Sequence, residues 1–213
     1  MTNATPQREI GNAITHGLGT VLSVPALIIL IIMARTHGDA WYVVSYAIFG
    51  SSMLFLYLAS TLYHATTSPK PKRTLEKLDH IGVFVLIAGS YTAFSLTILR
   101  NSVGWWVFGA VWAIAIFGSV IESLFLNRWP LATLGAYLAM GWLIILVWKQ
   151  LSTVGSASML TFLLAGGACY TIGTIFYSLG RRWGGFHIAW HLLVIAGTVC
   201  HFFSALAALP AQV

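Results

Sequence analysis

The sequence contains few charged residues. Only 8% of its 213 residues are Asp, Glu, Lys or Arg, whereas 58% are hydrophobic, and the mean hydropathy is +0.84. A soluble domain ordinarily carries about 25% charged residues, so the composition excludes that class. The sequence therefore predicts an integral membrane protein.

Acidic residues are the scarcest charged type. Five Asp and Glu stand against eleven Lys and Arg, which gives a formal net charge of +6. The cations are scattered among short loops and form no basic stripe of the kind that a nucleic-acid surface needs. We expect no nucleic-acid partner, and we interpret the excess of cations as information on membrane topology.

Cysteine motifs and a cleavage signal are also missing. Cys169 and Cys200 both fall inside predicted spans, and their spacing matches no zinc or redox motif. A thiol in such a place is most often a small buried apolar group. The first apolar run, beginning near Ala13, is long enough to span a bilayer and lacks a short apolar region ending in a cleavage site. We expect it to be retained as a helix.

Long apolar runs dominate what the sequence does contain. Seven segments are long enough to cross a bilayer, and charged residues or Gly, Pro and Asn separate them. Strands of a membrane β-barrel would be about 10 residues long and would alternate in polarity, so helices are expected. The longest expected loop is the polar run TTSPKPKRTLEK. We predict a single all-α, seven-transmembrane helix bundle over residues 1–213, with spans at roughly 13–34, 41–63, 79–99, 103–126, 131–148, 159–179 and 187–209.

The positions of Lys and Arg predict the orientation of this bundle. With the N-terminus inside, eight cations lie on the inner side and three on the outer side, as membrane proteins prefer. Seven spans then place the C-terminus outside. The inner cations are Arg8, Lys70, Lys72, Arg73, Lys77, Arg128, Arg181 and Arg182, and the outer ones are Arg35, Arg100 and Lys149.

Two histidines open the seventh predicted span. His187 and His191 are four residues apart and so lie on one face of a helix, which is typical of metal ligands. The predicted orientation brings His64, at the end of the second span, to the same depth. Three protein ligands and an open position are how catalytic zinc is held, so the three residues predict a zinc site. Alternatively, these histidines bind backbone carbonyls or mark the membrane interface.

Asp79 and Ser60 lie at the same predicted depth. Asp79 opens the third span, where it can cap the helix, point inward, or do both. An inward carboxylate would bind zinc directly, or hold the zinc-bound water and take its proton as a general base. Ser60 shares a helix face with His64. Its hydroxyl either bonds its own helix backbone or orients a ligand or the metal-bound water.

Three polar residues share one face at the start of the first span. Glu9, Asn12 and His16 are spaced i, i+3 and i+7. They form either an interfacial polar turn with capping or a network that supports the metal ligands and lines the inner mouth of the site.

Other ionisable residues have roles that the sequence leaves open. His80 lies about 100° around the helix from Asp79 and is not expected to share its metal. His201 lies about 15 Å deeper than the predicted site; we expect a structural hydrogen bond between helices, or a place in packing or in a cavity floor. Glu122 either pairs with Arg128 or faces the cavity.

Four motifs occur in order along nearly the whole chain. They are ExxNxxTH at Glu9–His16, SxxxH at Ser60–His64, KLDHIGVFVLIAGS around Asp79, and HxxxH at His187–His191 followed by His201. Together they resemble the haemolysin III family, the bacterial branch of the progestin and adipoQ receptor superfamily. The resemblance implies a multi-pass protein of the bacterial inner (plasma) membrane with its N-terminus inside. It further implies zinc near the inner face, held by His64, His187 and His191, with Asp79 holding a water and Ser60 supporting the site.

Three functions are compatible with these features. The first is an intramembrane zinc hydrolase of a lipid amide or ester such as a ceramide, acting in membrane lipid homeostasis. The alternative is a non-catalytic sensor or regulator of membrane state with a structural zinc. The third, a pore-forming cytolysin, follows from the family name, but a chain this apolar is poorly suited to the soluble form that a secreted pore-former needs. Membrane lipids and a lipid substrate are the expected partners; the oligomeric state is left open.

Overall fold

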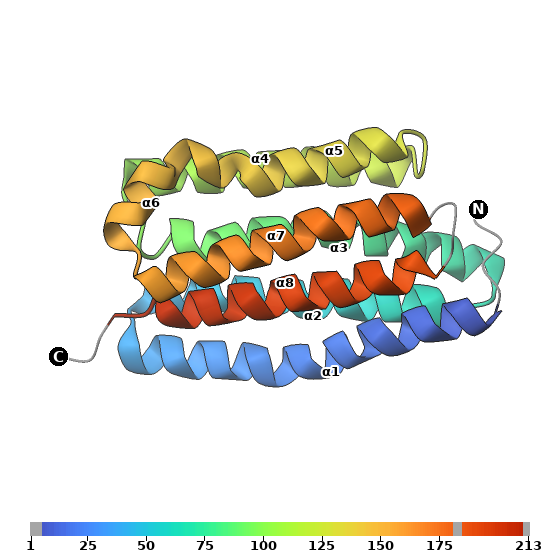
Figure 1. Ribbon diagram of the computed structural model, residues 1–213, viewed down its shortest axis with the longest axis horizontal. Coiled ribbons are helices and arrows are strands. Elements are labelled where there is room, and N and C mark those ends of the chain that lie inside the picture. The colour runs from blue at the N-terminus through green and yellow to red at the C-terminus, as the bar shows by residue number, and fades with distance from the viewer. Residues whose placement is uncertain (1–5, 181–184, 211–213) are drawn as a thin grey trace.

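All regular structure in the described chain is helical. The computed structural model describes residues 6–180 and 185–210, and Figure 1 shows its long helices running along roughly one common direction. In chain order the elements are α1 (Pro6–His37), α2 (Ala40–Ala65), α3 (Pro69–Ser95), α4 (Ser102–Leu124), α5 (Pro130–Gly141), the 3₁₀ helix η1 (Trp142–Val147), α6 (Trp148–Val154), α7 (Ala157–Gly180) and α8 (Phe186–Ala207).

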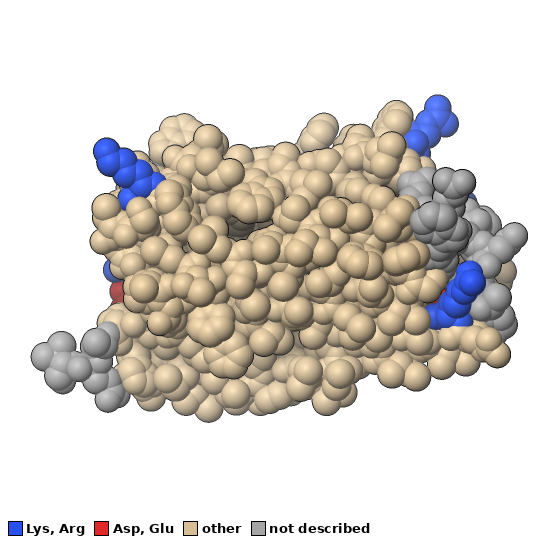
Figure 2. Space-filling view, in the orientation of Figure 1, with Lys and Arg blue, Asp and Glu red and all other residues tan. Residues whose placement is uncertain are grey.

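Within the described ranges, seven helical segments are long and apolar enough to cross a membrane. The fifth of these, Pro130–Val154, comprises α5, η1 and α6. On the face shown in Figure 2, the Lys and Arg side chains lie at the two ends and leave an uncharged belt between them. The predicted all-α, seven-span architecture is therefore confirmed, and the chain is a multi-pass membrane protein.

The helices pack so that α2 and α3 are the most enclosed. α1 packs against α2 and α8, α2 against α3, α3 against α4, and α7 against α8. Long tyrosine side chains span from α2 to α8. The Tyr57 hydroxyl donates to Thr198 Oγ1 at 2.6 Å, and the Tyr46 hydroxyl donates to the Ala205 carbonyl. These contacts fix the two helices that carry the histidines of the site.

α3 begins earlier than the sequence predicts. The run TTSPKPKRTLEK was expected to be a loop, but it is helical from Pro69 onward. Proline is favoured in the first helical turn because its missing N–H would be unsatisfied there anyway. The residue before the helix is Ser68, so Asp79 lies well inside α3 and cannot cap it. The capping interpretation of Asp79 was therefore wrong.

The fifth span is interrupted, although one continuous helix was expected over 131–148. α5 ends at Gly141 and the chain continues as a 3₁₀ helix. Tyr91 of α3 satisfies the backbone at this break. Its hydroxyl donates to the Gly141 carbonyl at 2.7 Å and accepts from the Ile144 N–H at 2.8 Å. A break inside a membrane needs such partners, because no water is there to replace them.

α1 also begins before its predicted span and is helical from Pro6. Glu9, Asn12 and His16 therefore do share one helix, as their spacing indicated. The end of the bundle at which α1 begins, which carries Glu9, is called the N-terminal end below (Figure 1). Arg181 and Arg182, which entered the predicted count of inner cations, lie outside the described residues.

Candidate metal centre

Three imidazoles meet at the N-terminal end of the bundle. His64 lies in the last turn of α2, and His187 and His191 lie in the first two turns of α8. One ligand nitrogen of each lies within 4.8 Å of those of the other two. The ring centroids are 5.4 Å apart for His64 and His187, 5.1 Å for His64 and His191, and 4.6 Å for His187 and His191. The structure thus brings together the three histidines that the sequence selected.

The start of α8 lies very close to the end of α7. A Cβ atom on Gly180 would lie 3.1 Å from the backbone nitrogen of His187 and 3.3 Å from its Cα. Any larger residue at position 180 would push the first turn of α8 away. The absence of a side chain there helps to place His187 beside His64, more than one hundred residues away in the sequence.

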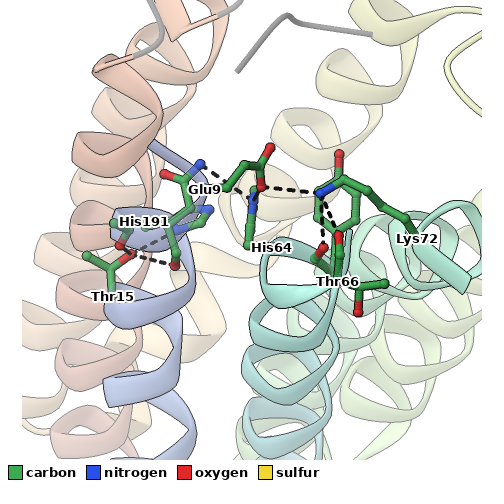
Figure 3. A network of polar contacts seen from close by, with 9 residues as sticks. Glu9, Thr15, His64, Thr66, Lys72 and His191 are labelled. Atoms are coloured by element: carbon green, nitrogen blue, oxygen red, sulfur yellow. Dashed lines mark hydrogen bonds and ion pairs between the residues drawn. The ribbon is translucent and has the colours of Figure 1, made fainter. Parts of the chain in front are cut away.

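Glu9 fixes the orientation of the His64 ring. Its carboxylate lies 2.8 Å from His64 Nδ1, and Figure 3 shows it between His64 and Lys72. The other ring nitrogen, His64 Nε2, is buried and has no hydrogen-bond partner in the described part of the chain. A carboxylate on one nitrogen keeps the proton there and leaves the lone pair of the other nitrogen for a metal.

Thr15 does the same for His191. Its hydroxyl lies 3.0 Å from His191 Nδ1 and 2.9 Å from the Asn12 carbonyl (Figure 3). Because the hydroxyl proton is used on a backbone carbonyl, the oxygen accepts from His191 Nδ1–H. Sequence reasoning did not select Thr15, although it belongs to the motif ExxNxxTH. A Thr one residue before His16 gave no sign that it would reach a histidine in another helix.

His16 and Asn12 also lie against the three histidines. The His16 ring stacks on His191 at a centroid distance of 3.6 Å and an angle of 14°. Nearly parallel rings at this distance do not both direct a nitrogen at one ion, so His16 supports His191 by packing. The Asn12 amide lies 3.5 Å from His64 Nδ1, and only 4% of this residue is exposed. A buried amide and a stacked imidazole do not fit the alternative of an exposed interfacial turn.

Asp79 and Ser60 lie next to this cluster without joining it. The Asp79 side chain is partly buried and lies near Ser60 and His64. It does not belong to the group of ligand atoms within 4.8 Å of one another that the described residues form. The Ser60 hydroxyl is fully buried and interacts with the Asp79 carboxylate, although no partner in that part of the chain, its own helix backbone included, meets normal hydrogen-bond geometry. The structure therefore favours neither direct ligation by Asp79 nor a self-satisfied Ser60.

Lys72 joins three helices at the edge of the cluster. Its ammonium group lies 3.4 Å from the Glu9 carboxylate on α1 and donates to the backbone carbonyls of Tyr63 in α2 and of Thr66 directly after it (Figure 3). Lys72 was expected in a loop, and only the early start of α3 brings it here. It balances the Glu9 charge in a place where a lone carboxylate would be costly.

A second polar cluster lies between α3, α4 and α5. The Glu122 carboxylate, which is 4% exposed, lies 2.7 Å from His80 Nδ1. It also accepts from the Asn127 N–H at 3.3 Å and from the Thr133 hydroxyl at 3.1 Å. Glu122 thus pairs with His80, and neither expected role, a pair with Arg128 or a place facing the cavity, is seen.

A largely apolar cavity lies between the helices, and its lining among the described residues includes neither the three histidines nor Asp79. It is lined by α2, α3, α5, η1, α7 and α8, including Val83, Tyr137, Gly167, Trp190 and His201. Figure 2 shows the surface hollowed between the fifth span and α7, where this cavity opens.

His201 lies at the wall of this cavity. Its ring packs edge-on against Tyr170 at a centroid distance of 5.2 Å. Neither ring nitrogen has a partner of normal hydrogen-bond geometry among the described residues. The Leu163 backbone of α7 interacts with the ring without meeting that geometry, so the expected link between the two helices is formed only loosely. His201 also contributes to the cavity wall.

The fold and the site define a class: multi-pass membrane proteins with a buried cluster of three histidines that can hold a metal ion. The chain belongs to the haemolysin III family, because it matches the family described as Haemolysin-III related over residues 4–202. It is 45% identical to the Hemolysin-3 homolog of Bacillus subtilis (strain 168), covering 95% of this chain and 94% of the relative. It is 44% identical to Hemolysin-3 of Bacillus cereus, covering 94% and 91%.

A more distant relative is human. The Monocyte to macrophage differentiation factor of Homo sapiens is 26% identical, covering 94% of this chain and 84% of the relative. The match agrees with membership of the wider progestin and adipoQ receptor superfamily, which the motifs indicated.

Proposed function

We propose that this protein is a zinc-dependent hydrolase of a lipid amide or ester, acting in the bacterial inner membrane. One observation carries the proposal. The three histidines converge, and His64 keeps a buried nitrogen without a partner in the described chain while Glu9 occupies its other nitrogen. An imidazole held in this way is prepared to bind a metal ion.

The donor set fits zinc. Neutral imidazole nitrogens are typical zinc ligands, and three of them leave one position open in a tetrahedral site. His64, His187 and His191 would hold the ion, while Glu9 and Thr15 keep the ring protons on the Nδ1 atoms of His64 and His191. Zinc bound there supplies a Lewis acid that polarises a carbonyl group and makes water a stronger nucleophile.

Asp79 is the residue best placed to move a proton. It lies near His64 and Ser60, at the side of the cluster that faces α3. In the proposed reaction its carboxylate takes the proton of the attacking water and then delivers it to the leaving amine or alcohol. The Ser60 hydroxyl, which faces the Asp79 carboxylate, would help to hold that carboxylate or the attacking water in place.

The cavity supports a membrane lipid as the substrate. Its wall includes Trp190 of α8, one residue before His191, and Tyr137, whose hydroxyl binds the His80 carbonyl at 2.8 Å. An acyl chain lying in the cavity would extend along α8 towards the turn that carries His191, although the three histidines do not line the cavity themselves. Its opening between the fifth span and α7 would admit a lipid directly from the bilayer (Figure 2).

The test combines metal analysis with a lipid panel. We expect purified protein to contain zinc and to release fatty acid from a ceramide or phospholipid. His64→Ala and His191→Ala should lose both properties, whereas Asp79→Asn should keep zinc and lose the release. Zinc that is unchanged in both histidine variants would rule out the site. If wild-type protein with zinc cleaves no lipid of the panel, the hydrolase proposal is wrong.

A structural zinc is the second candidate, and one observation favours it. All three ligands come from only two helices, α2 and α8, so an ion would join them without help from α3. A sensor or regulator of membrane state would need no more than that. In this case Asp79→Asn keeps both the metal and the ability to complement a strain that lacks the gene. If the protein is a hydrolase, Asp79→Asn loses that ability.

A further inference from the structure

At the N-terminal end of the bundle, one face of α3 is attached to α4 and α5. Four contacts of the Glu76–His80 turn make this attachment. They are Glu76 to the Asn127 amide at 2.8 Å, Lys77 to the Ser123 carbonyl, His80 to Glu122 at 2.7 Å, and the Tyr137 hydroxyl to the His80 carbonyl at 2.8 Å.

Asp79 belongs to the same turn but faces elsewhere. It lies about 100° around the helix from His80 and is directed towards Ser60 and His64. A rotation of α3 that loosened the His80 contact would therefore also move the Asp79 carboxylate relative to the three histidines.

Glu122 is the centre of the attachment. It is buried within a membrane-spanning helix, where a carboxylate is costly unless it is paired. Its three donors come from different segments. They are His80 on α3, the Asn127 N–H in the connection after α4, and the Thr133 hydroxyl on α5. Asn127 has a φ of 59°, a conformation that asparagine tolerates better than most residues, and this brings its N–H to the carboxylate.

We propose that Glu122 and His80 are positioning residues that set the rotation of α3 and thereby the place of Asp79 at the metal centre. The inference rests on the proposed function. The histidines themselves come from α2 and α8, so the attachment of α3 governs what happens beside the metal and not whether the metal binds. Glu122 and His80 would thus act on the reaction without touching the metal or the substrate.

Glu122→Gln tests this proposal, because glutamine keeps the shape of the side chain and removes the charge. The protein is loaded with Co²⁺ in place of zinc, and its visible absorption spectrum reports the surroundings of the ion. We expect the spectrum of Glu122→Gln to move towards that of Asp79→Asn, while zinc affinity stays at the wild-type value. Lipid hydrolysis should fall by about 10- to 100-fold, as for other residues that orient a metal site from outside. Asp39→Asn, at the opposite end of the bundle, is the control and should leave the spectrum unchanged.

Tyr137→Phe is the second variant, for the case that Glu122→Gln does not fold. It removes only the hydroxyl that binds the His80 carbonyl, and it should shift the spectrum in the same direction by less. A wild-type spectrum in the folded variants would overturn the proposal, as would a loss of zinc equal to that of His64→Ala. If wild-type protein cleaves no lipid, the hydrolase proposal fails, but the cobalt spectra still decide whether Glu122 positions Asp79.

Discussion

Glu9 and Thr15 determine which nitrogen His64 and His191 leave free. Each binds the Nδ1 atom of its histidine, at 2.8 Å and 3.0 Å. Both residues come from α1, whereas the histidines come from α2 and α8. The first helix therefore supplies none of the three ligands and yet orients two of them.

Replacing Glu9 should weaken metal binding without unfolding the protein. We expect Glu9→Ala to lower zinc affinity by about 10- to 100-fold, because His64 loses the group that holds its ring. Competition with a chromogenic chelator measures this. Asp39→Asn, which removes a carboxylate far from the site, should bind zinc like wild type. Equal affinity in Glu9→Ala and wild type would contradict the role assigned to Glu9.

Asp39 offers a pH-dependent effect outside the membrane-spanning segments. Burial raises the pKa of its carboxyl group, but Arg100 at 2.7 Å and the N–H groups of Trp41 and Tyr42 together hold the pKa below its ordinary value. A lowered pKa stabilises the folded state above the unfolded value of about 4, and this stabilisation is lost as the pH falls through the folded pKa. Thermal unfolding of wild type and Asp39→Asn should thus differ near neutral pH, by at most about 1 kcal/mol for so exposed a pair, and converge in acid.

At the scale of helices, α7 and α8 approach each other closely beside the cavity. A Cβ atom on Gly166 would lie 2.2 Å from the His201 ring and 3.0 Å from the Gly197 carbonyl. At the neighbouring Gly167, a Cβ atom would have nothing within 4 Å. A larger residue is therefore excluded at position 166 and is accommodated at position 167.

Gly166→Ala should destabilise the protein and Gly167→Ala should not. Overpacking typically costs about 1–3 kcal/mol, whereas alanine in an open helical position stabilises by about 0.5–1 kcal/mol. Thermal unfolding in detergent compares the two variants directly. The same stability loss in both would show that helix geometry, and not the approach of α8, governs these positions.

Tyr91→Phe addresses the break in the fifth span. Loss of the hydroxyl leaves the Gly141 carbonyl and the Ile144 N–H without their partner inside the membrane, which should cost about 1–3 kcal/mol. The change is read as a lower unfolding temperature in detergent. Tyr42→Phe is the matched control, because its hydroxyl makes only a long contact of 3.4 Å with the Ala208 carbonyl and should matter less. A Tyr91→Phe variant as stable as wild type would mean that the break needs no such support.

At the scale of the whole molecule, the charges predict how the bundle lies in the membrane. Cations at the N-terminal end outnumber those at the other end, even when Arg181 and Arg182 are left aside. We therefore expect the N-terminus inside and the C-terminus outside. A reporter enzyme that is active only outside the cytoplasm should work when fused after α8 and fail when fused after α2. The reverse pattern would invert the whole assignment.

The sequence predicted the features that follow from local spacing and composition. Seven apolar runs indicated seven spans, and the i, i+4 spacing of His187 and His191 placed both on one face. Charge counting then brought His64 to the same depth. Contacts between distant helices could not be predicted, because Thr15, Lys72 and Glu122 carry no local sign of their partners. The start of α3 was missed because a polar run next to a membrane looks like a loop even when it is helical.

The distance in sequence between the ligands also has a consequence for synthesis. His64 lies in the second span and the other two ligands in α8, more than one hundred residues later. While a ribosome is making the intervening spans, His64 and Glu9 are already in the membrane, but no ion can find three ligands. At the proposed metal site, a nascent chain would thus stay free of metal until α8 arrives, and capture of the ion would mark the joining of α2 to α8.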